Sequence, residues 1–203
     1  MIAIIDYGRG NLFSLLSALE YLGCKHKLVS NPMELKNNFN KIILPGVGAF
    51  RDAIYQLKQK KFFEEIINIH KQKVPILGIC LGMQLFSSKS YEFFETPGLN
   101  IIPGEVKKLS LDSKYKIPNM GWRRLEATPI ALKEKIQFNK MMYFVHSYAF
   151  YPKDEKHIFS FIKIGNEKIP AIVKKDYVIG FQFHPERSGS EGLDMLNWYV
   201  NAL

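Results

Sequence analysis

Val74-Pro75-Ile76-Leu77-Gly78-Ile79-Cys80-Leu81-Gly82-Met83-Gln84 indicates more about the fold than any other segment. An apolar run ends in a cysteine, and a glycine lies two residues to either side of it. This layout is typical of a nucleophile elbow, in which a strand turns sharply into a helix. Glycine lacks the Cβ that would collide in such a turn. A lone cysteine after an apolar run is more often part of the core, but the flanking glycines favour a reactive thiol at a helix N-terminus.

The residues before this stretch alternate between strand and helix patterns. Strands are predicted at residues 2–5, 27–29, 42–44 and 74–79, and the last is apolar enough to be buried on both faces. Helical spacing follows Asn11 and ends at Gly23, Pro32 opens a short helix, and two more helices cover residues 52–58 and 62–70. The alternation predicts an α/β fold with a doubly wound, mainly parallel sheet flanked by helices. Ligands of such sheets bind beyond the C-terminal ends of the strands.

The pattern changes after about residue 100. Short strand-like runs are found at residues 102–109, 142–145, 159–164, 169–173 and 178–183, and a last helix covers about 190–202. We expect these strands to form an antiparallel or mixed extension of the sheet. The sequence shows no repeat or long linker, so residues 1–203 are expected to form a single domain.

Composition narrows the class of protein. The 203 residues are 47% hydrophobic and 23% charged, which is typical of a soluble globular protein. The net charge of +9 indicates a solvated, lysine-rich surface. No apolar run approaches the roughly 18–20 residues that cross a bilayer, and the basic residues are scattered, so we expect neither membrane nor nucleic-acid binding. The two cysteines make no disulfide framework, and the N-terminal run lacks the basic region of a signal peptide. A cytoplasmic location is expected.

A second motif, Gly180-Phe181-Gln182-Phe183-His184-Pro185-Glu186, supplies partners for the thiol. In an extended segment, residues two apart point to the same side, so Glu186 could hold one nitrogen of His184 while the other faces Cys80. The backbone N–H groups of Leu81 and of the segment Pro45-Gly46-Val47-Gly48 are candidate donors of an oxyanion hole. The alternative is a surface loop with unrelated His and Glu residues.

Together these motifs resemble the class I (triad) glutamine amidotransferases, which have a flavodoxin-like sheet. Further segments are similar to the glutaminase subunits of imidazole glycerol phosphate synthases. They are Asp6-Tyr7-Gly8-Arg9-Gly10-Asn11-Leu12, Leu44-Pro45-Gly46-Val47-Gly48-Ala49-Phe50, Pro118-Asn119-Met120-Gly121-Trp122 and Tyr143-Phe144-Val145-His146-Ser147-Tyr148. The resemblance covers essentially the whole chain in unbroken order.

The resemblance implies hydrolysis of L-glutamine to L-glutamate and ammonia for histidine biosynthesis, without a metal or cofactor. Cys80 would form a γ-glutamyl thioester, His184 would move the proton, and Glu186 would orient His184. The oxyanion hole would use the backbone of Val47, Gly48 and Leu81, and the Val47 amide would have to turn to complete it. The residues that would hold the glutamine are Gly48, Gln84 and Glu92.

The resemblance also implies a partner, because ammonia released into neutral water is mostly protonated and no longer nucleophilic. We expect a heterodimer with a (β/α)8-barrel synthase subunit, the cyclase. The residues expected at the interface are Asn11, Asn119, Met120, Trp122, Tyr143, His146 and Arg187. Asn119 and Arg187 depart from the histidine-pathway pattern, in which His and Lys are common at these positions.

Several alternatives use some of the same residues. A paralogous glutaminase could supply ammonia for surface-sugar modification, and a stand-alone γ-glutamyl cysteine hydrolase would need an open cleft and no partner. A binding module with a dead site is a third alternative, but all three triad residues are present. His184-Pro185-Glu186 also fits the H-x-E of zinc deaminases, but no P-C-x-x-C follows to supply thiolates. Gly8-Arg9-Gly10 is a weak dinucleotide motif, because Phe13 replaces the third glycine.

Overall fold

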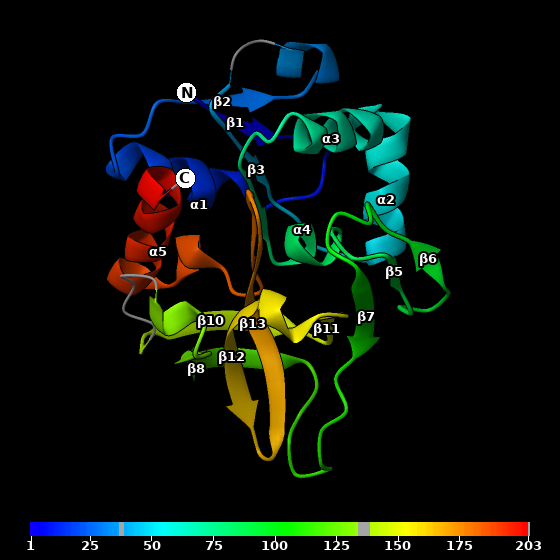
Figure 1. The fold of residues 1–203 in the computed structure, drawn as a ribbon, viewed down its shortest axis with the longest axis vertical. Coiled ribbons are helices and arrows are strands. Elements are labelled where there is room, and N and C mark those ends of the chain that lie inside the picture. The colour runs from blue at the N-terminus through cyan, green and yellow to red at the C-terminus, as the bar shows by residue number, and fades with distance from the viewer. Residues whose placement is uncertain (37–38, 134–138, 203) are drawn as a thin grey trace.

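The computed structural model describes residues 1–36, 39–133 and 139–202. In this part of the chain the largest sheet has eight strands, in the order β2-β1-β3-β4-β14-β13-β12-β9 (Figure 1). The parallel strands are β2 (His26–Val29), β1 (Ile2–Ile5), β3 (Lys41–Leu44), β4 (Ile76–Ile79) and β14 (Val178–Phe181). The antiparallel ones are β13 (Glu167–Lys175), β12 (Ile158–Ile164) and β9 (Glu126–Ala127). The predicted mainly parallel sheet with an antiparallel extension is confirmed.

Helices cover both faces of the parallel part (Figure 1). Helices α1 (Leu12–Tyr21) and α5 (Gly189–Ala202) lie on one face, and α2 (Phe50–Gln59) and α3 (Phe62–Lys71) lie on the other. Alternate residues of β1 enter the two cores: Ile2 and Ile4 pack with α1 and α5, whereas Ala3 and Ile5 pack with α2 and α3. This is the side-chain alternation of a strand that is buried on both sides.

Several predicted strands lie outside the main sheet. Strand β7 (Gly104–Lys108) belongs to a four-stranded sheet with β11 (Tyr148–Pro152), β5 (Lys89–Ser90) and β6 (Thr96–Pro97). Strand β10 (Met141–His146) pairs with β8 (Asn119–Arg124) in a two-stranded sheet. The expectation that residues 102–109 and 142–145 extend the main sheet is therefore wrong. Strand patterns identify strands, but the choice of pairing partner depends on the tertiary packing.

The predicted helices and strands otherwise differ from the structure mainly at their ends. The short helices are η1 (Pro32–Lys36), η2 (Ala131–Lys133), η3 (Glu155–His157) and η4 (Pro185–Arg187), all of the 3-10 type, and α4 (Leu81–Gln84). Gly23 closes α1 with a left-handed φ of 67°, as the pattern indicated. Helix α4 has only four residues, so the helix after Cys80 is shorter than expected.

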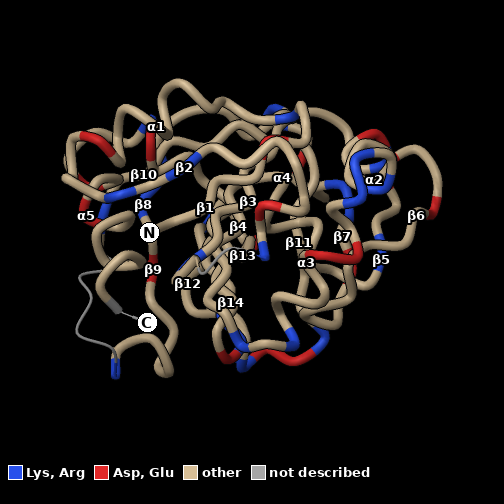
Figure 2. The backbone as a smooth tube through the Cα atoms, turned by 90° about the horizontal axis from the view of Figure 1, so that it is seen from above, with Lys and Arg blue, Asp and Glu red and all other residues tan. Residues whose placement is uncertain are grey.

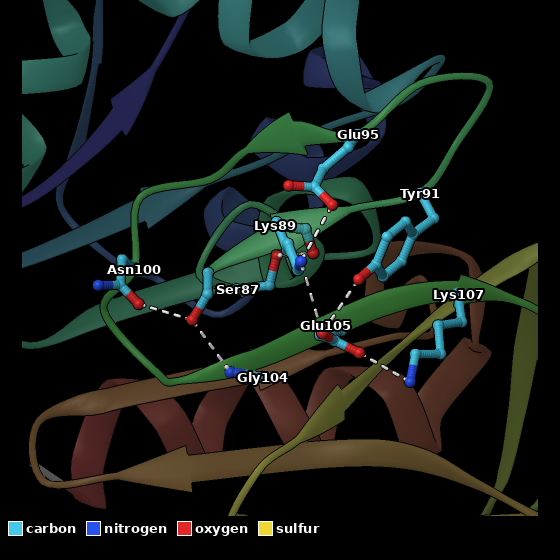
Figure 3. A network of polar contacts seen from close by, with 9 residues as sticks. Ser87, Lys89, Tyr91, Glu95, Asn100, Gly104, Glu105 and Lys107 are labelled. Atoms are coloured by element: carbon cyan, nitrogen blue, oxygen red, sulfur yellow. Dashed lines mark hydrogen bonds and ion pairs between the residues drawn. The ribbon is translucent and has the colours of Figure 1, made fainter.

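A polar network stabilises the small sheet beside the C-terminal edge of the parallel strands (Figure 3). Lys89 Nζ lies 3.0 Å from Glu95 Oε2, and Lys107 Nζ lies 2.7 Å from Glu105 Oε2. The Tyr91 hydroxyl donates to Glu105 Oε1 over 3.3 Å. Each contact is partly exposed and individually weak, but together they hold both ends of the loop that carries Glu92.

Charged residues are spread over helices, strands and loops. Figure 2 shows Lys and Arg interspersed with Asp and Glu along the tube, as expected from the scattered basic residues of the sequence. Among the residues described, no helix has the length and apolarity required to cross a membrane.

Candidate active site

The turn from β4 into α4 holds Cys80 in a strained backbone conformation. Cys80 has φ 53° and ψ −108°, values that a non-glycine residue rarely adopts. A Cβ added at Gly82 would lie 1.9 Å from the Leu44 carbonyl oxygen, and one added at Gly78 would lie 2.6 Å from the backbone of Gly82. Both glycines are therefore needed for the close approach of backbone segments, as the sequence predicted. The sharp strand-to-helix turn at Cys80 is confirmed.

Cys80 lies at a cavity of about 340 Å³ formed beyond the C-terminal ends of three neighbouring parallel strands. Residues after β3 contribute Val47 and Gly48, residues after β4 contribute Cys80, and the residues after β14 contribute His184. This is the edge at which parallel sheets bind ligands. The other lining residues are Leu81, Gln84, Glu92, Pro118, Val145, His146, Ser147 and Tyr148.

His184 and Glu186 are in direct contact. His184 Nδ1 lies 2.8 Å from Glu186 Oε1, and the two side chains are only 4% and 3% exposed. The local backbone differs from the prediction, because Glu186 belongs to the 3-10 turn η4 rather than to an extended segment. His184 itself is extended, and Pro185 occupies the first position of the turn. The turn, and not strand alternation, brings the carboxylate to the imidazole.

The charge of this cluster favours a protonated imidazole. Burial alone would lower the pKa of His184, but interactions with the Cys80 sulfur and the Glu186 carboxylate outweigh it and raise the pKa above that of an ordinary imidazole. Glu186 Oε2 is buried and has no hydrogen-bond partner among the described residues. A proton that moves from the sulfur to His184 would therefore reach an imidazole held by a buried carboxylate.

The predicted oxyanion segment follows β3 and lines the cavity through Val47 and Gly48. Gly48 has φ 98°, a left-handed conformation that glycine adopts freely, and the Val47 side chain is 38% exposed. Leu81 begins α4, where N–H groups lack acceptors within the helix. Val47, Gly48 and Leu81 line the same cavity as Cys80, so their backbone N–H groups stay candidate oxyanion donors.

The two side chains predicted to hold glutamine both line the cavity, and both also make internal hydrogen bonds. Gln84 Nε2 donates to the Tyr148 carbonyl over 2.9 Å and to Gln182 Oε1 over 3.0 Å. Glu92 Oε2 accepts from the backbone N–H of Phe50 over 2.6 Å, at the first residue of α2. Glu92 therefore caps the helix that follows the oxyanion segment.

The residues predicted for a partner interface divide into two groups. Met120 and Trp122 on β8 are 58% and 49% exposed. Arg187 is exposed, and its Cζ lies 4.6 Å from the centroid of the Tyr143 ring. Asn11 is half-buried and directly precedes α1. Trp122 and Tyr143 pack edge to face with their ring centroids 6.1 Å apart. Met120, Trp122, Tyr143 and Arg187 form an aromatic surface on and beside strands β8 and β10, whose ends line the cavity.

Asn119 and His146 belong to the second group, because they are buried, at 1% and 6% exposed. Asn119 Nδ2 lies 3.0 Å from His146 Nε2, and Asn119 Oδ1 accepts from Arg123 Nε over 2.9 Å. Their burial in the isolated chain runs against the expectation of direct partner contact. They position the strands that carry the exposed residues.

One residue that sequence analysis did not single out lies against the sulfur. Gln182 is fully buried, and its Nε2 lies 3.6 Å from Cys80 Sγ. The available signal was a polar residue inside an otherwise apolar run, two positions before His184. No group of three or more His, Cys, Asp or Glu residues that could hold a metal ion is found in the described ranges.

Comparisons with known proteins agree with this geometry. A sequence model of the family described as Glutamine amidotransferase class-I matches residues 3–201. The Imidazole glycerol phosphate synthase subunit HisH of Carboxydothermus hydrogenoformans is 44% identical, covering 97% of this chain and 96% of its own. The subunit HisH 1 of Methanococcus maripaludis is 45% identical over 100% of both chains. A crystal structure of a glutamine amidotransferase matches with a TM-score of 0.76 at 16% identity over 100% of both chains, a similarity of fold.

Proposed function

Because the chain belongs to the glutamine amidotransferase class-I family, we propose that it is the glutaminase subunit of an imidazole glycerol phosphate synthase, in histidine biosynthesis. It hydrolyses L-glutamine to L-glutamate and ammonia. One observation carries this proposal: a strained cysteine and a histidine held by a buried glutamate line one cavity, in a chain that matches such subunits over its length. The names of these relatives favour this function over the surface-sugar alternative.

In the first half of the proposed reaction, Cys80 Sγ attacks the side-chain amide carbon of glutamine. The thiol proton passes to His184, whose positive charge is stabilised by Glu186. The C–N bond then breaks, His184 gives its proton to the leaving nitrogen, and ammonia departs. A γ-glutamyl thioester remains on Cys80.

In the second half, His184 takes a proton from water, and the resulting hydroxide attacks the thioester carbon. The C–S bond breaks, the sulfur leaves as a thiolate, and glutamate is released. Both halves pass through a negatively charged oxygen, for which the N–H groups of Leu81 and of the Val47–Gly48 backbone are the nearest candidates. Donation from the second group requires the Val47 amide to turn toward the substrate.

The cavity also contains groups suited to the amino-acid end of glutamine. Glu92 offers a carboxylate for the α-ammonium group. Both hydrogens of Gln84 Nε2 are already donated within the protein, so Gln84 can only accept from the substrate, through Oε1. Gly48 leaves room for the substrate because no Cβ occupies that side of the cavity.

The subunit names of the relatives indicate assembly with a second subunit, which we propose to be a (β/α)8-barrel cyclase bound over the aromatic surface. Exposed Trp, Tyr, Met and Arg residues are enriched at protein interfaces. Docking there would cover the cavity and keep ammonia from being protonated by bulk water. A reducing cytoplasm, which would keep Cys80 as a thiol, is part of the same proposal.

The test is an assay of glutamate formation by the full chain, with and without the cyclase, in wild-type and Cys80→Ala forms. We expect glutaminase activity that rises on addition of the cyclase and is lost in Cys80→Ala. Retained activity in Cys80→Ala would contradict the nucleophile. Strong activity that the cyclase does not change would instead favour a stand-alone γ-glutamyl hydrolase.

A further inference from the structure

Three buried amide groups form a chain of hydrogen bonds that ends at the nucleophile. The Tyr148 carbonyl accepts from Gln84 Nε2 over 2.9 Å, and Gln182 Oε1 accepts from the same nitrogen over 3.0 Å. Gln182 Nε2 in turn lies 3.6 Å from Cys80 Sγ. Gln182 is fully buried and is not among the residues that line the cavity, so it approaches the sulfur from within the protein.

The donor and acceptor roles in this series of hydrogen bonds follow from the Tyr148 carbonyl. A backbone carbonyl can only accept a hydrogen bond, so Gln84 must point its NH₂ group toward Tyr148. The same nitrogen lies within hydrogen-bond distance of Gln182, so Gln182 must present its carbonyl oxygen to Gln84. Its NH₂ group is then left facing the sulfur. The orientation of both side-chain amides is thus determined by a group that cannot be flipped.

We propose that Gln182 is a further catalytic residue, which donates an N–H hydrogen bond to Cys80 Sγ and stabilises the thiolate on which the reaction depends. The inference rests on the proposed function and deepens it. A donor at the sulfur favours the anion over the neutral thiol when the proton moves to His184. It acts again when the thioester breaks, because the sulfur must then leave as a thiolate. In the thioester itself the sulfur is neutral, so the hydrogen bond from Gln182 stabilises this state least.

Gln84 is a positioning residue in the same device. It does not touch the sulfur, but it fixes which end of the Gln182 amide faces it. A hydrogen bond to a charged group contributes more than one between neutral groups. We therefore expect removal of the Gln182 amide to reduce activity more than replacement of Gln84, which only orients that amide.

The test measures alkylation of Cys80 by iodoacetamide as a function of pH, with the labelled site identified by mass spectrometry. A Cys24→Ser background leaves Cys80 as the single thiol. In Gln182→Leu, which removes the donor, we expect the midpoint of the alkylation profile to rise by about one pH unit. This corresponds to about tenfold slower labelling below the midpoint, or about 1.4 kcal/mol. Turnover with the cyclase should fall about tenfold through kcat, with KM for glutamine unchanged.

Two further variants keep the test decisive. Gln182→Glu keeps the size of the side chain but replaces the donor by an acceptor, so its midpoint should rise further than that of Gln182→Leu. It also serves if the leucine variant does not fold. Gln59→Leu, at an exposed position near the end of helix α2, is the matched control and should leave both profiles unchanged.

The outcomes separate this inference from the proposed function. An unchanged midpoint in a folded Gln182 variant, together with an inactive Cys80→Ala variant, would overturn the role of Gln182 alone. Glutaminase activity in Cys80→Ala would overturn the proposed function itself. A fall in activity without a shift of the alkylation midpoint would show a structural role, and would also overturn the inference.

Discussion

Cys80 and His184 each depend on neighbouring groups that hold them in an unusual state. The strained φ of Cys80 is tolerated because neighbouring glycines let three backbone segments approach closely. His184 is buried and contacts Oε1 of the Glu186 carboxylate. Oε2 of the same carboxylate has no hydrogen-bond partner among the described residues. The contacts of His184 raise its pKa and favour the protonated imidazole.

Glu186→Gln should reduce turnover far more than glutamine binding. The substitution keeps the size of the side chain but removes the negative charge that supports a protonated His184. We expect kcat to fall on the order of 10²- to 10⁴-fold, as it does when the aspartate of a Ser-His-Asp triad is replaced. Steady-state glutaminase assays would measure kcat and KM separately. Glu20→Gln on the exposed face of α1 is the control, and a change confined to KM would refute the orienting role.

His146 should make the stability of the protein depend on pH. Burial lowers the pKa of His146 to about 4, and its hydrogen bonds to Asn119 and the Tyr148 carbonyl fit the neutral ring. The unfolded chain binds this proton near pH 6.5, whereas the folded protein does not. The contribution of neutral His146 is therefore complete above about pH 6.5, and stability is lost as the pH falls toward about 4.

Urea unfolding of wild type and His146→Gln between pH 4 and pH 7 would measure this effect. We expect the difference in unfolding free energy between the two proteins to shrink as the pH falls, because only the wild type loses the histidine contribution. His26→Gln, on partly exposed strand β2, is the matched control. Parallel curves for wild type and His146→Gln would contradict the proposed neutral, buried state.

The fold depends on glycine for two different reasons, one at the turn between β4 and α4 and the other at the end of α1. At Gly82 the need is space, because an added Cβ would meet the Leu44 carbonyl. At Gly23, after α1, the need is conformational, because φ is 67° but nothing lies within 4 Å of an added Cβ. Alanine substitutions at the two positions therefore distinguish steric crowding from backbone strain.

Gly82→Ala should be much more destabilising than Gly23→Ala. We expect Gly23→Ala to cost about 1 kcal/mol, the usual penalty for a left-handed alanine. Gly82→Ala forces the backbone of β3 and α4 apart and should cost more than about 3 kcal/mol or prevent folding. Thermal and urea unfolding of both variants would compare them. Equal losses would show that the elbow does not require the close approach described.

Over the whole molecule, the cavity and the aromatic surface lie at the same end of the main sheet. The side chains of Trp122 and Met120 are exposed there, whereas Tyr177 lies at the opposite end of β14. Charged groups are distributed along the whole chain (Figure 2). A partner that covers the cavity would therefore bury apolar groups that the isolated chain leaves in water.

Trp122→Ala should weaken assembly with the cyclase and leave the isolated subunit folded. Large aromatic residues at the centre of an interface commonly contribute 2 kcal/mol or more, so we expect Kd to rise by roughly 30-fold or more. Titration calorimetry would measure Kd, and thermal unfolding would check the fold. Tyr177→Ala, equally aromatic but at the far end, should leave Kd unchanged. An unaltered Kd in Trp122→Ala would exclude this surface as the docking face.

The α/β class, the parallel strands and the elbow at Cys80 could be predicted from residue patterns alone. These features depend on short-range rules: apolar periodicity, the steric freedom of glycine and the conformational limits of proline. The contact of His184 with Glu186 was also expected, although the 3-10 turn that makes it was not. Neighbouring residues are enough to encode such local geometry.

Three features emerge only from the folded chain: the pairing of strands outside the main sheet, the burial of Asn119 and His146, and the approach of Gln182 to the sulfur. Cys80 and Gln182 are 102 positions apart, and Gln84 and Gln182 are 98 apart. Their contact exists because β4 and β14 are neighbours in the sheet. Strand order follows from how all the apolar faces are buried together, and no local pattern contains that information.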